Sequence, residues 1–421
     1  MSAPRITELS SRIALNTSKL NEYFVAHNLP TPSFDVDGPL DFPSANDPDI
    51  DSIRFSIVDD TLELRRLILG PKLHLMSFSV NEILCQQVII RYRLAHAFPV
   101  GGEATFTEIA NISGLSEADT RQILRRAILL GIFAEPHPGV VAHTATSRLL
   151  AEDEVFHDWV GANVDDLGPA SAHVCEAMEK WPSSEEPTQT GFALANNTDK
   201  SIYGFFSDHP ERAERFANAM RALGSRDDLE SHHTVNSFPW GELGDGIVVD
   251  IGGSRGTVVT AIARKYPSLS FVVQDLEPVV ESGRKNIPPD VAERVQFMAH
   301  DFLTPQPVKN ADVYYLRWIL HNWPDKYCII ILRNLIPALK PGARIVVNDN
   351  VLPTPGGMSN WKETRLRSTD LTMKAIQNSH ERELDDWKKL FAMVDHKLEL
   401  LGAEQPSGSS LWMMVLQWKG D

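Results

Sequence analysis

Apolar residues recur at helical spacing over residues 6–27, which predicts an amphipathic helix at the start of the chain. Residues 30–52 are polar and rich in Pro and Asp, without periodicity, and predict a loop or mobile linker. Helical periodicity returns over residues 57–69 and 80–97. The apolar positions of the first helix are Ile6, Leu9, Ile13, Leu20 and Phe24.

Residues 103–150 follow a more specific pattern. A short helix over 106–112 ends at Gly114, and Ser116 then caps a second helix that closes at Gly131. A hairpin follows, with its turn at Pro138-Gly139. Helix, turn, helix and hairpin together predict a winged helix, which serves either DNA binding or dimerisation and substrate enclosure.

The sequence pattern changes after Pro239. Residues 151–228 are predicted to be helical, whereas after Pro239 short apolar runs bounded by Gly, Pro or Asp alternate with helical segments. This alternation predicts a doubly wound parallel α/β sheet. The last two runs are separated only by PSGSS, too short for a helical crossover, so we expect an antiparallel hairpin. The five earlier runs are 246–252, 270–275, 295–301, 311–318 and 343–349.

The pattern therefore divides the chain into an all-helical, winged-helix domain at residues 1–228 and an α/β domain at residues 229–421. The formal net charge is −16, which argues against nucleic acid or an anionic membrane as the main partner and favours the scaffold interpretation of the winged helix. Arg121, Arg125 and Arg126 on its second predicted helix keep the DNA-binding alternative open.

Composition narrows the cellular setting. No apolar run approaches the ~18 residues of a membrane span, and the first residues lack an apolar signal region. Cys85, Cys175 and Cys328 form no C-x-x-C pair, so we expect free, buried thiols in a reducing, cytoplasmic compartment and no zinc site.

Three successive predicted strands end in groups that suit a nucleoside ligand. The first is followed by Gly252 and Gly253, which allow close approach of the backbone to a ligand. Asp275 ends the second, 23 residues beyond Gly252, where a carboxylate can bind ribose hydroxyls. Asp301 and Phe302 end the third and suit an adenine amine and ring face. A dinucleotide alternative fits less well, because the G-G-S-R-G spacing departs from G-x-G-x-x-G.

The fourth strand ends in RWILHNWPD, and with this motif the chain resembles the plant- and fungal-type O-methyltransferases, the caffeate and flavonoid type. Within this family, the sequence most resembles the fungal O-methyltransferases of secondary metabolism. The motifs VVDIGGSRG, QDLEPVV, AHDF, RWILHNWPD and ALKPGARIVVNDNVLP fall in family order, and the resemblance covers nearly the whole chain.

The resemblance implies S-adenosylmethionine (SAM) as cofactor, S-adenosylhomocysteine as product, and no metal. It also implies a homodimer built through the N-terminal helices, burying the apolar faces of residues 6–27 and 80–97. The residues that it assigns to the cofactor are Gly252, Gly253, Asp275, Asp301, Phe302, Arg317 and Trp323.

The resemblance further assigns His321 as catalytic base, flanked by the carboxylates of Asp349 and Glu381. This assignment is chemically reasonable, because a phenol of pKa about 10 is a poor nucleophile until a histidine takes its proton. This chain has Asn322 after the histidine, Ser254 in the glycine motif and an aspartate at 349, where relatives commonly have Asp, Gly and Glu.

The expected acceptor is a phenolic or enolic hydroxyl of a small aromatic or polyketide-like metabolite. Two alternatives belong to other classes: a SAM-binding cyclase or pericyclase on the same fold, and a winged-helix regulator that senses SAM. Retained His321 favours methyl transfer over the cyclase, and the acidity of the chain argues against the regulator. The candidate substrate-enclosing residues are Trp159, Phe192, Phe206, Met220, Met373 and Asn378.

Overall fold

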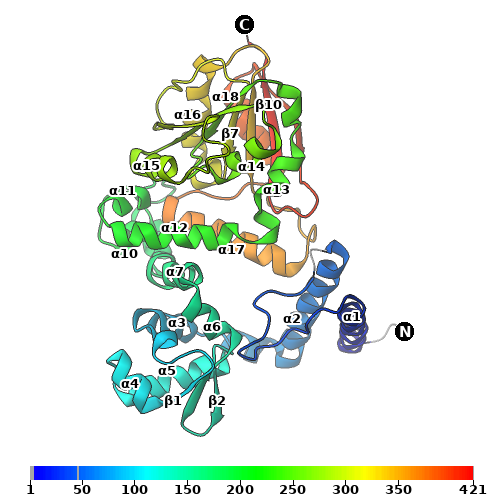
Figure 1. Ribbon diagram of the computed structural model, residues 1–421, viewed down its shortest axis with the longest axis vertical. Coiled ribbons are helices and arrows are strands. Elements are labelled where there is room, and N and C mark those ends of the chain that lie inside the picture. The colour runs from blue at the N-terminus through cyan, green and yellow to red at the C-terminus, as the bar shows by residue number, and fades with distance from the viewer. Residues whose placement is uncertain (1–3, 45–46, 421) are drawn as a thin grey trace. The chain divides into compact units, whose positions relative to one another are not determined.

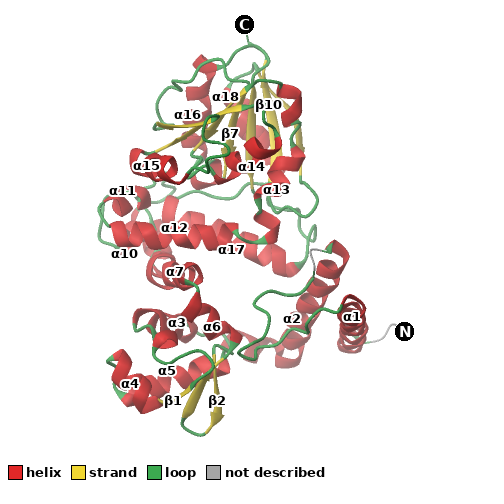
Figure 2. Ribbon diagram, in the orientation of Figure 1, coloured by secondary structure: helices red, strands yellow, loops and turns green. Residues whose placement is uncertain are grey.

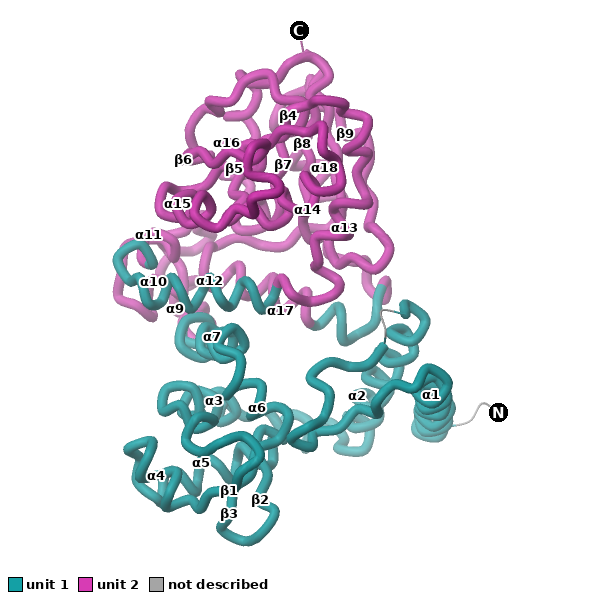
Figure 3. The backbone as a smooth tube through the Cα atoms, viewed as in Figure 1, with its two compact units in different colours: residues 1–169, 206–223, 358–364 teal, residues 170–205, 224–357, 365–421 magenta. Residues whose placement is uncertain are grey.

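The computed structural model describes residues 4–44 and 47–420, which form two compact units (Figure 3). One unit takes in residues up to 169, 206–223 and 358–364, and the other takes in 170–205, 224–357 and the residues from 365 onward. The chain thus passes between the units more than once. The division into functional domains at residues 1–228 and 229–421 stays a prediction.

The first unit opens with two long helices, α1 (Arg5–His27) and α2 (Pro48–Met76) (Figure 1). The linker predicted at 30–52 is therefore too long at its end, because Asp47 caps α2 by accepting bonds from Asp49 N at 2.9 Å and Ile50 N at 3.3 Å. Pro at the first helical position needs no donor there, which also favours a start at residue 48. Residues 45 and 46 of that predicted linker lie outside the described residues.

Residues 103–143 fold into two helices and three short antiparallel strands in the order β1-β3-β2. Thr105 and Glu108 form a capping box at the start of α4, and Gly114 ends it with a φ of 77°. Ser116 caps α5 by accepting from Asp119 N at 3.1 Å. The elements are β1 (Glu103–Thr105), α4 (Phe106–Ser113), α5 (Glu117–Leu129), β2 (Phe133–His137) and β3 (Val140–His143).

Short helices complete the first unit, and four of the described helices have residues in both units. The predicted helix over 80–97 is shorter, because Arg93 adopts a left-handed φ of 48° and separates α3 from a short turn. The remaining elements are α3 (Asn81–Arg91), η1 (Leu94–His96), α6 (Ala145–Glu152), α7 (Glu154–Ala162) and η2 (Asn163–Leu167), with α8 (Gly168–Ala172), α11 (Ile202–Ser207), α12 (Pro210–Gly224) and α17 (Asn360–Gln377) shared between the units.

The second unit is built on a seven-stranded sheet in the order β6-β5-β4-β7-β8-β10-β9 (Figure 2). The first five strands in this order are parallel, and β10 pairs antiparallel with both β8 and β9. The strands are β4 (Ile247–Ile251), β5 (Ser270–Asp275), β6 (Val295–Ala299), β7 (Val313–Arg317), β8 (Arg344–Asp349), β9 (Leu398–Glu404) and β10 (Trp412–Trp418).

Side chains alternate between the two faces of this sheet, and each face is covered by helices. On one face Tyr314 and Leu316 pack with α16 (Asp325–Leu335) and α18 (Leu384–Val394). On the other, Val313 and Tyr315 pack with α13 (Ser231–Ser237) and α14 (Thr257–Lys265). Burial on both sides explains why these strands read as continuous apolar runs. The other elements are α9 (Val174–Lys180), α10 (Gly191–Ala195), η3 (Asp227–Leu229), η4 (Trp240–Leu243), α15 (Glu277–Asn286), η5 (Leu320–Asn322) and η6 (Ile336–Ala338).

The strand order reverses between β4 and β7, because β5 and β6 lie on one side of β4 and β7 and β8 on the other. Open α/β sheets bind ligands at the carboxyl ends of the strands at such a switch point. This edge therefore positions the candidate site.

The helices and the cysteines bear on the predictions of no membrane span and of buried thiols. Among the described residues, no single helix is long and apolar enough to cross a membrane; only α2 and α3 pass by length and composition as a pair, and they are bent by 77°. Cys85 and Cys328 are buried as predicted, but the prediction is wrong for Cys175, which is exposed on α9. The cytoplasmic setting stays a prediction.

Candidate active site

The turn after β4 is shaped by three residues with left-handed backbone: Gly252 (φ 69°), Ser254 (φ 53°) and Gly256 (φ 72°). A Cβ on Gly252 would lie 2.3 Å from Ile319 Cδ1, and one on Gly253 would lie 2.3 Å from Asp250 Oδ2. The sequence thus has glycine where the backbone must come close to its neighbours. Ser254 keeps the same conformation without glycine.

Asp275, the last residue of β5, ties its strand to this turn. Its Oδ2 accepts from Ser254 N at 2.9 Å and its Oδ1 from Leu276 N at 2.8 Å. Burial raises the pKa of Asp275, and these two backbone bonds oppose the rise. Each carboxylate oxygen keeps a further lone pair for a ligand hydroxyl.

Aromatic residues from two strand ends gather beside Gly252. Its Cβ position would lie 3.9 Å from Phe302 Cε1, and the Phe302 ring meets Trp323 edge to face at 5.8 Å between centroids. Asp301 follows β6, which ends at Ala299, and its exposed carboxylate accepts from Leu303 N at 2.9 Å. The structure therefore brings Gly252, Phe302 and Trp323 together, with Asp301 next to them along the chain.

Arg317 ends β7, and Asp250 lies near the end of the neighbouring strand β4. Arg317 donates to the main-chain oxygen of Leu229, and its guanidinium lies 5.4 Å from the Trp318 ring. Burial and the nearby Asp275 carboxylate raise the pKa of Asp250 to about 7, while Arg317 opposes the rise. Sequence reasoning missed Asp250, although a carboxylate inside an otherwise apolar strand, VVDIG, was a usable signal.

His321 lies at the centre of η5, directly after β7, and its side chain is 10% exposed. The residue that leads into this turn, Trp318, has a φ of 54°, a conformation that is rare and costly for a bulky side chain. Its ring stacks with that of His321 at 6.2 Å between centroids. Asn322 donates to Trp318 O at 3.0 Å and so closes the turn without contacting the His321 ring.

The two carboxylates predicted beside His321 are both present, but they contact different parts of it. Glu381 Oε1 lies 2.9 Å from His321 Nδ1, whereas Asp349 Oδ2 accepts from the His321 backbone N at 3.2 Å. Asn350 Nδ2 donates to the same Glu381 oxygen at 3.0 Å. Because an ionised carboxylate only accepts, Nδ1 carries the hydrogen, and in the neutral ring Nε2 keeps a lone pair.

These buried charges shift one another. Burial lowers the pKa of His321, but the carboxylates of Glu381 and Asp349 more than offset this, so the pKa is raised overall. Burial and the Glu381 charge raise the pKa of Asp349 to about 6. Burial opposes ionisation of Glu381 as well, yet His321 and Asn350 lower its pKa. Glu381 is therefore the carboxylate that stays charged next to the imidazole.

The predicted substrate residues are divided between the two units. Phe192, Met373 and Asn378 are buried in the second unit, where Asn378 Nδ2 donates to Glu186 O at 3.0 Å and Gln189 O at 2.6 Å. The other three, Trp159, Phe206 and Met220, belong to the first unit. Their role in substrate enclosure stays a prediction.

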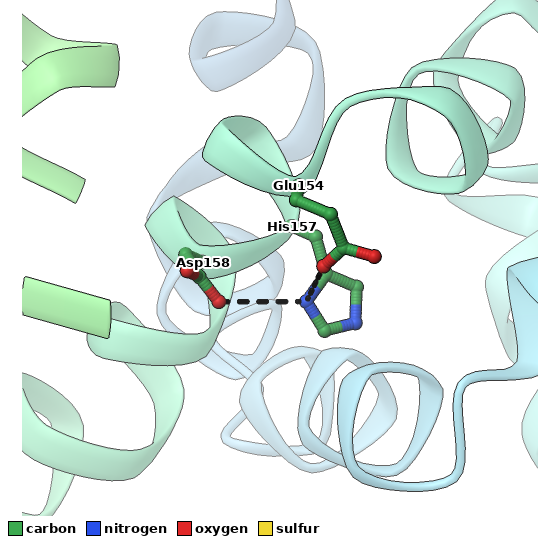
Figure 4. Close-up of side chains that lie close together, drawn as sticks. All are labelled: Glu154, His157 and Asp158. Atoms are coloured by element: carbon green, nitrogen blue, oxygen red, sulfur yellow. Dashed lines mark ion pairs between the residues drawn. The ribbon is translucent and has the colours of Figure 1, made fainter. Parts of the chain in front are cut away.

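A second group of titratable side chains lies on α7 in the first unit, where Glu154 and Asp158 flank the buried His157 (Figure 4). Their oxygens lie 3.9 and 3.8 Å from His157 Nδ1, beyond hydrogen-bond distance. Each carboxylate has a partner elsewhere: Arg93 pairs with Glu154, and Asn218 donates to Asp158 at 2.8 Å. Burial lowers the pKa of His157, which favours the neutral ring. These pairs tie α7 to neighbouring segments of its own unit.

Comparisons with known proteins show the family of this chain. A family model described as an O-methyltransferase domain matches residues 193–396. O-methyltransferase pyvH of Aspergillus violaceofuscus is 39% identical over the full length of both chains. The chlorophenol O-methyltransferase of Trichoderma longibrachiatum is 35% identical, covering 98% of this chain and 90% of its own.

Solved structures show the same fold at low identity. OxaC in complex with S-adenosylhomocysteine and oxaline is 22% identical, with a TM-score of 0.79 over 98% of this chain and 99% of that one. LepI in complex with SAM is also 22% identical, with a TM-score of 0.74 over 98% and 100% of the chains.

The fold and the strand-end site define a methyltransferase of the doubly wound α/β class. The full-length relatives place it further: the chain belongs to the O-methyltransferase family and is a SAM-dependent O-methyltransferase. The residues present fit SAM, because the open backbone at Gly252 and Gly253, the Asp275 carboxylate and the Phe302 ring offer a close approach, a ribose acceptor and an apolar surface.

We expect Gly252→Ala to weaken SAM binding by at least about tenfold, because the added methyl group strains a left-handed backbone and meets Ile319 beside the predicted cofactor position. Isothermal titration calorimetry with SAM measures the change. Gly342→Ala is the matched control, since Gly342 has a φ of 81° but nothing within 4 Å of the added Cβ. Equal losses in both variants would contradict a cofactor role for the Gly252 turn.

Proposed function

We propose that this enzyme transfers the methyl group of SAM to a phenolic or enolic hydroxyl of a small aromatic or polyketide-like metabolite, with His321 as general base. One observation carries the proposal: the buried imidazole has Nδ1 bonded to Glu381 at 2.9 Å, which leaves Nε2 as a proton acceptor. A base held by a carboxylate on its other ring nitrogen is an arrangement found in general-base catalysis.

Bound SAM supplies a methyl group on a sulfonium centre, already activated for displacement. The residues of the chain must hold the acceptor hydroxyl in line, exclude water and remove its proton. His321 Nε2 takes that proton as the new oxygen–carbon bond forms, and Glu381 stabilises the resulting imidazolium through Nδ1–H. Orientation of the two reactants alone is worth up to about 7–11 kcal/mol.

The raised pKa of His321 has two consequences for proton removal from the acceptor hydroxyl. It makes the neutral ring a stronger base toward a phenol. It also means that the ring is protonated, and so inactive, at acidic pH. Catalytic activity is therefore expected to rise with pH through a limb that lies above the ordinary histidine value of about 6.5.

The chemical class of the acceptor is supported by the names of relatives and by the candidate enclosing residues. One relative of similar length is named for chlorophenol. The apolar set of Trp159, Phe192, Phe206, Met220 and Met373 suits an aromatic or apolar ligand. The Asn378 side-chain amide donates hydrogen bonds to the main-chain oxygens of Glu186 and Gln189. These bonds support a role for Asn378 in shaping the predicted pocket.

The principal test is incubation with methyl-labelled SAM and a panel of chlorinated phenols and polyketide-like phenols. We expect label in the organic product with the native enzyme and a decrease of about 100- to 10,000-fold in kcat for His321→Ala, since a general base contributes that much. The exposed His396→Ala is the matched control.

Undiminished transfer in His321→Ala would remove His321 as the base. Tight SAM binding without label transfer to any acceptor would instead favour a cyclase or pericyclase on this fold, as would turnover of an unmethylated substrate. Binding to DNA that depends on SAM would favour the regulator.

Glu381→Gln tests the electrostatic part of the proposal through pH dependence. Loss of the negative charge lowers the pKa of His321, so the acid limb of kcat/KM is expected to move to lower pH. The plateau is expected to fall by about 10- to 100-fold, because the imidazolium loses its partner. The exposed Glu293→Gln should change neither quantity, and an unmoved limb in Glu381→Gln would contradict the assignment.

We also propose that the chain works as a homodimer through its N-terminal helices, with residues 103–143 as a winged-helix scaffold and no DNA contact. The proposal is supported by large apolar side chains that are exposed from α2 to α3. Large exposed apolar side chains close together along the chain are costly in water and are typical of protein interfaces. The exposed residues are Ile68, Leu73, Leu75, Met76, Phe78 and Val80.

Light scattering at micromolar concentration is expected to give twice the mass of the chain, and Phe78→Glu is expected to shift the protein toward monomer, because it places a charge in the predicted interface. Leu401→Glu on β9 is the control, since Leu401 is exposed outside this patch. A native protein that is monomeric under these conditions would contradict the dimer.

A further inference from the structure

Residues 379–382, which follow α17, hold the short turn that carries His321, together with the Asp349 carboxylate on the His321 backbone N and the Cys328 thiol on the Leu320 and Trp323 carbonyls. Ser379 Oγ donates to His321 O at 2.6 Å, and Glu381 accepts from His321 Nδ1 at 2.9 Å. Arg382 then reaches the carbonyls on either side of the histidine, donating from Nη1 to Leu320 O at 3.3 Å and from Nη2 to Trp323 O at 2.8 Å.

Arg382 is well placed to do this because every part of its guanidinium is engaged. The residue is 1% exposed, and Asp325 Oδ1 accepts from its Nε at 2.9 Å and its Nη2 at 2.7 Å. The guanidinium lies 5.0 Å from the Trp387 ring. A buried charge is tolerated only when it is paired and hydrogen-bonded, and Arg382 meets both conditions.

The arginine is itself anchored at the carboxyl edge of the sheet. Leu352 N, three residues beyond β8, donates to Arg382 O at 2.8 Å. The backbone that presents Glu381 to one side of the histidine therefore presents Arg382 to the carbonyls of the same turn. Movement of this segment would displace the Glu381 carboxylate and the His321 turn together.

We propose that Arg382 is a positioning residue for the catalytic base: its planar fork fixes the Leu320–Trp323 turn so that His321 stays aligned with Glu381. This inference rests on the proposed role of His321 as base. Lysine cannot replace the fork, because one ammonium group cannot hold Asp325 and two separate carbonyls in the same geometry.

The charge of Arg382 adds an electrostatic contribution of opposite sign to that of Glu381. The carboxylates raise the pKa of His321, and the Arg382 charge opposes this rise. Geometry and charge are therefore separable by substitution: Arg382→Lys keeps the charge and loses the fork, whereas Arg382→Met loses both.

The experiment measures kcat, KM and their pH dependence with methyl-labelled SAM and the panel phenol that gives the highest turnover. For Arg382→Lys we expect kcat to fall about 10- to 100-fold with an unmoved acid limb, because displaced supporting residues cost this much. For Arg382→Met we expect a similar fall with the limb moved to higher pH. Affinity for SAM should change by less than about twofold in both.

Arg294→Met is the matched control, because the Arg294 guanidinium also binds three backbone carbonyls, those of Ala263, Tyr266 and Leu269, away from His321. It should lower the melting temperature and leave kcat and the pH limb unchanged. If Arg382→Met does not fold, Arg382→Lys alone decides the question. A kcat for Arg382→Lys within about twofold of the native value would overturn the proposal.

A double-mutant cycle separates failure of this inference from failure of the proposed function. If Arg382 acts through His321, Arg382→Lys should cost little more in the His321→Ala background, since residues that act as a unit are not additive. A full, additive loss in that background would assign Arg382 a general structural role. Undiminished activity of His321→Ala itself would instead remove the base.

Discussion

The hydrogen bond between His321 Nδ1 and Glu381 Oε1 is the contact on which the proposed chemistry depends. In the neutral ring it places the hydrogen on Nδ1 and leaves a lone pair on Nε2, and under the proposal it stabilises the positive charge that the ring gains. The bond joins a turn after β7 to a loop after α17, 60 residues further along the chain. Most of the packing around it serves to bring these two segments to one place and keep them there.

The sheet makes that meeting possible. Parallel strands β7 and β8 end at the same edge, with Arg317 in register with Asn348, so the turn after one strand and Asp349 at the end of the other become neighbours. The Asp349 carboxylate then holds the backbone of His321 rather than its ring. An aspartate, one methylene shorter than glutamate, reaches this backbone N–H, and the longer Glu381 serves the imidazole.

Much of this arrangement follows from the sequence, because strand ends are marked locally. The apolar runs bounded by Gly, Pro or Asp predict the parallel strands, and the residues just after them, such as Gly252 and Asp275, predict the edge where ligands bind. Contacts made by side chains across the fold carry no such local mark. Nothing near Arg382 in the sequence indicates that it caps carbonyls some sixty residues earlier. The start of α2 does carry a local signal, Asp47 followed by Pro48, but this pair lies in a run of Pro and Asp that is otherwise typical of a loop. Asp250 carries a local signal too, as a carboxylate in an apolar strand, but the sequence does not show that Asp275 lies near it.

The charges around the imidazole act on its pKa in both directions. With only Glu381 nearby, proton uptake by His321 replaces one buried negative charge by a neutral ion pair. This favours proton uptake and so raises the pKa of the imidazole. A second buried carboxylate, Asp349, further favours proton uptake by His321. Burial and the Glu381 charge in turn raise the pKa of Asp349 itself to about 6. Arg382 carries a buried charge of opposite sign and opposes the rise that the two carboxylates cause in the pKa of His321. Its bonds to Leu320 O and Trp323 O place this charge at the same turn without occupying His321 Nδ1, so the three charges act together on the ring while its bond to Glu381 stays intact.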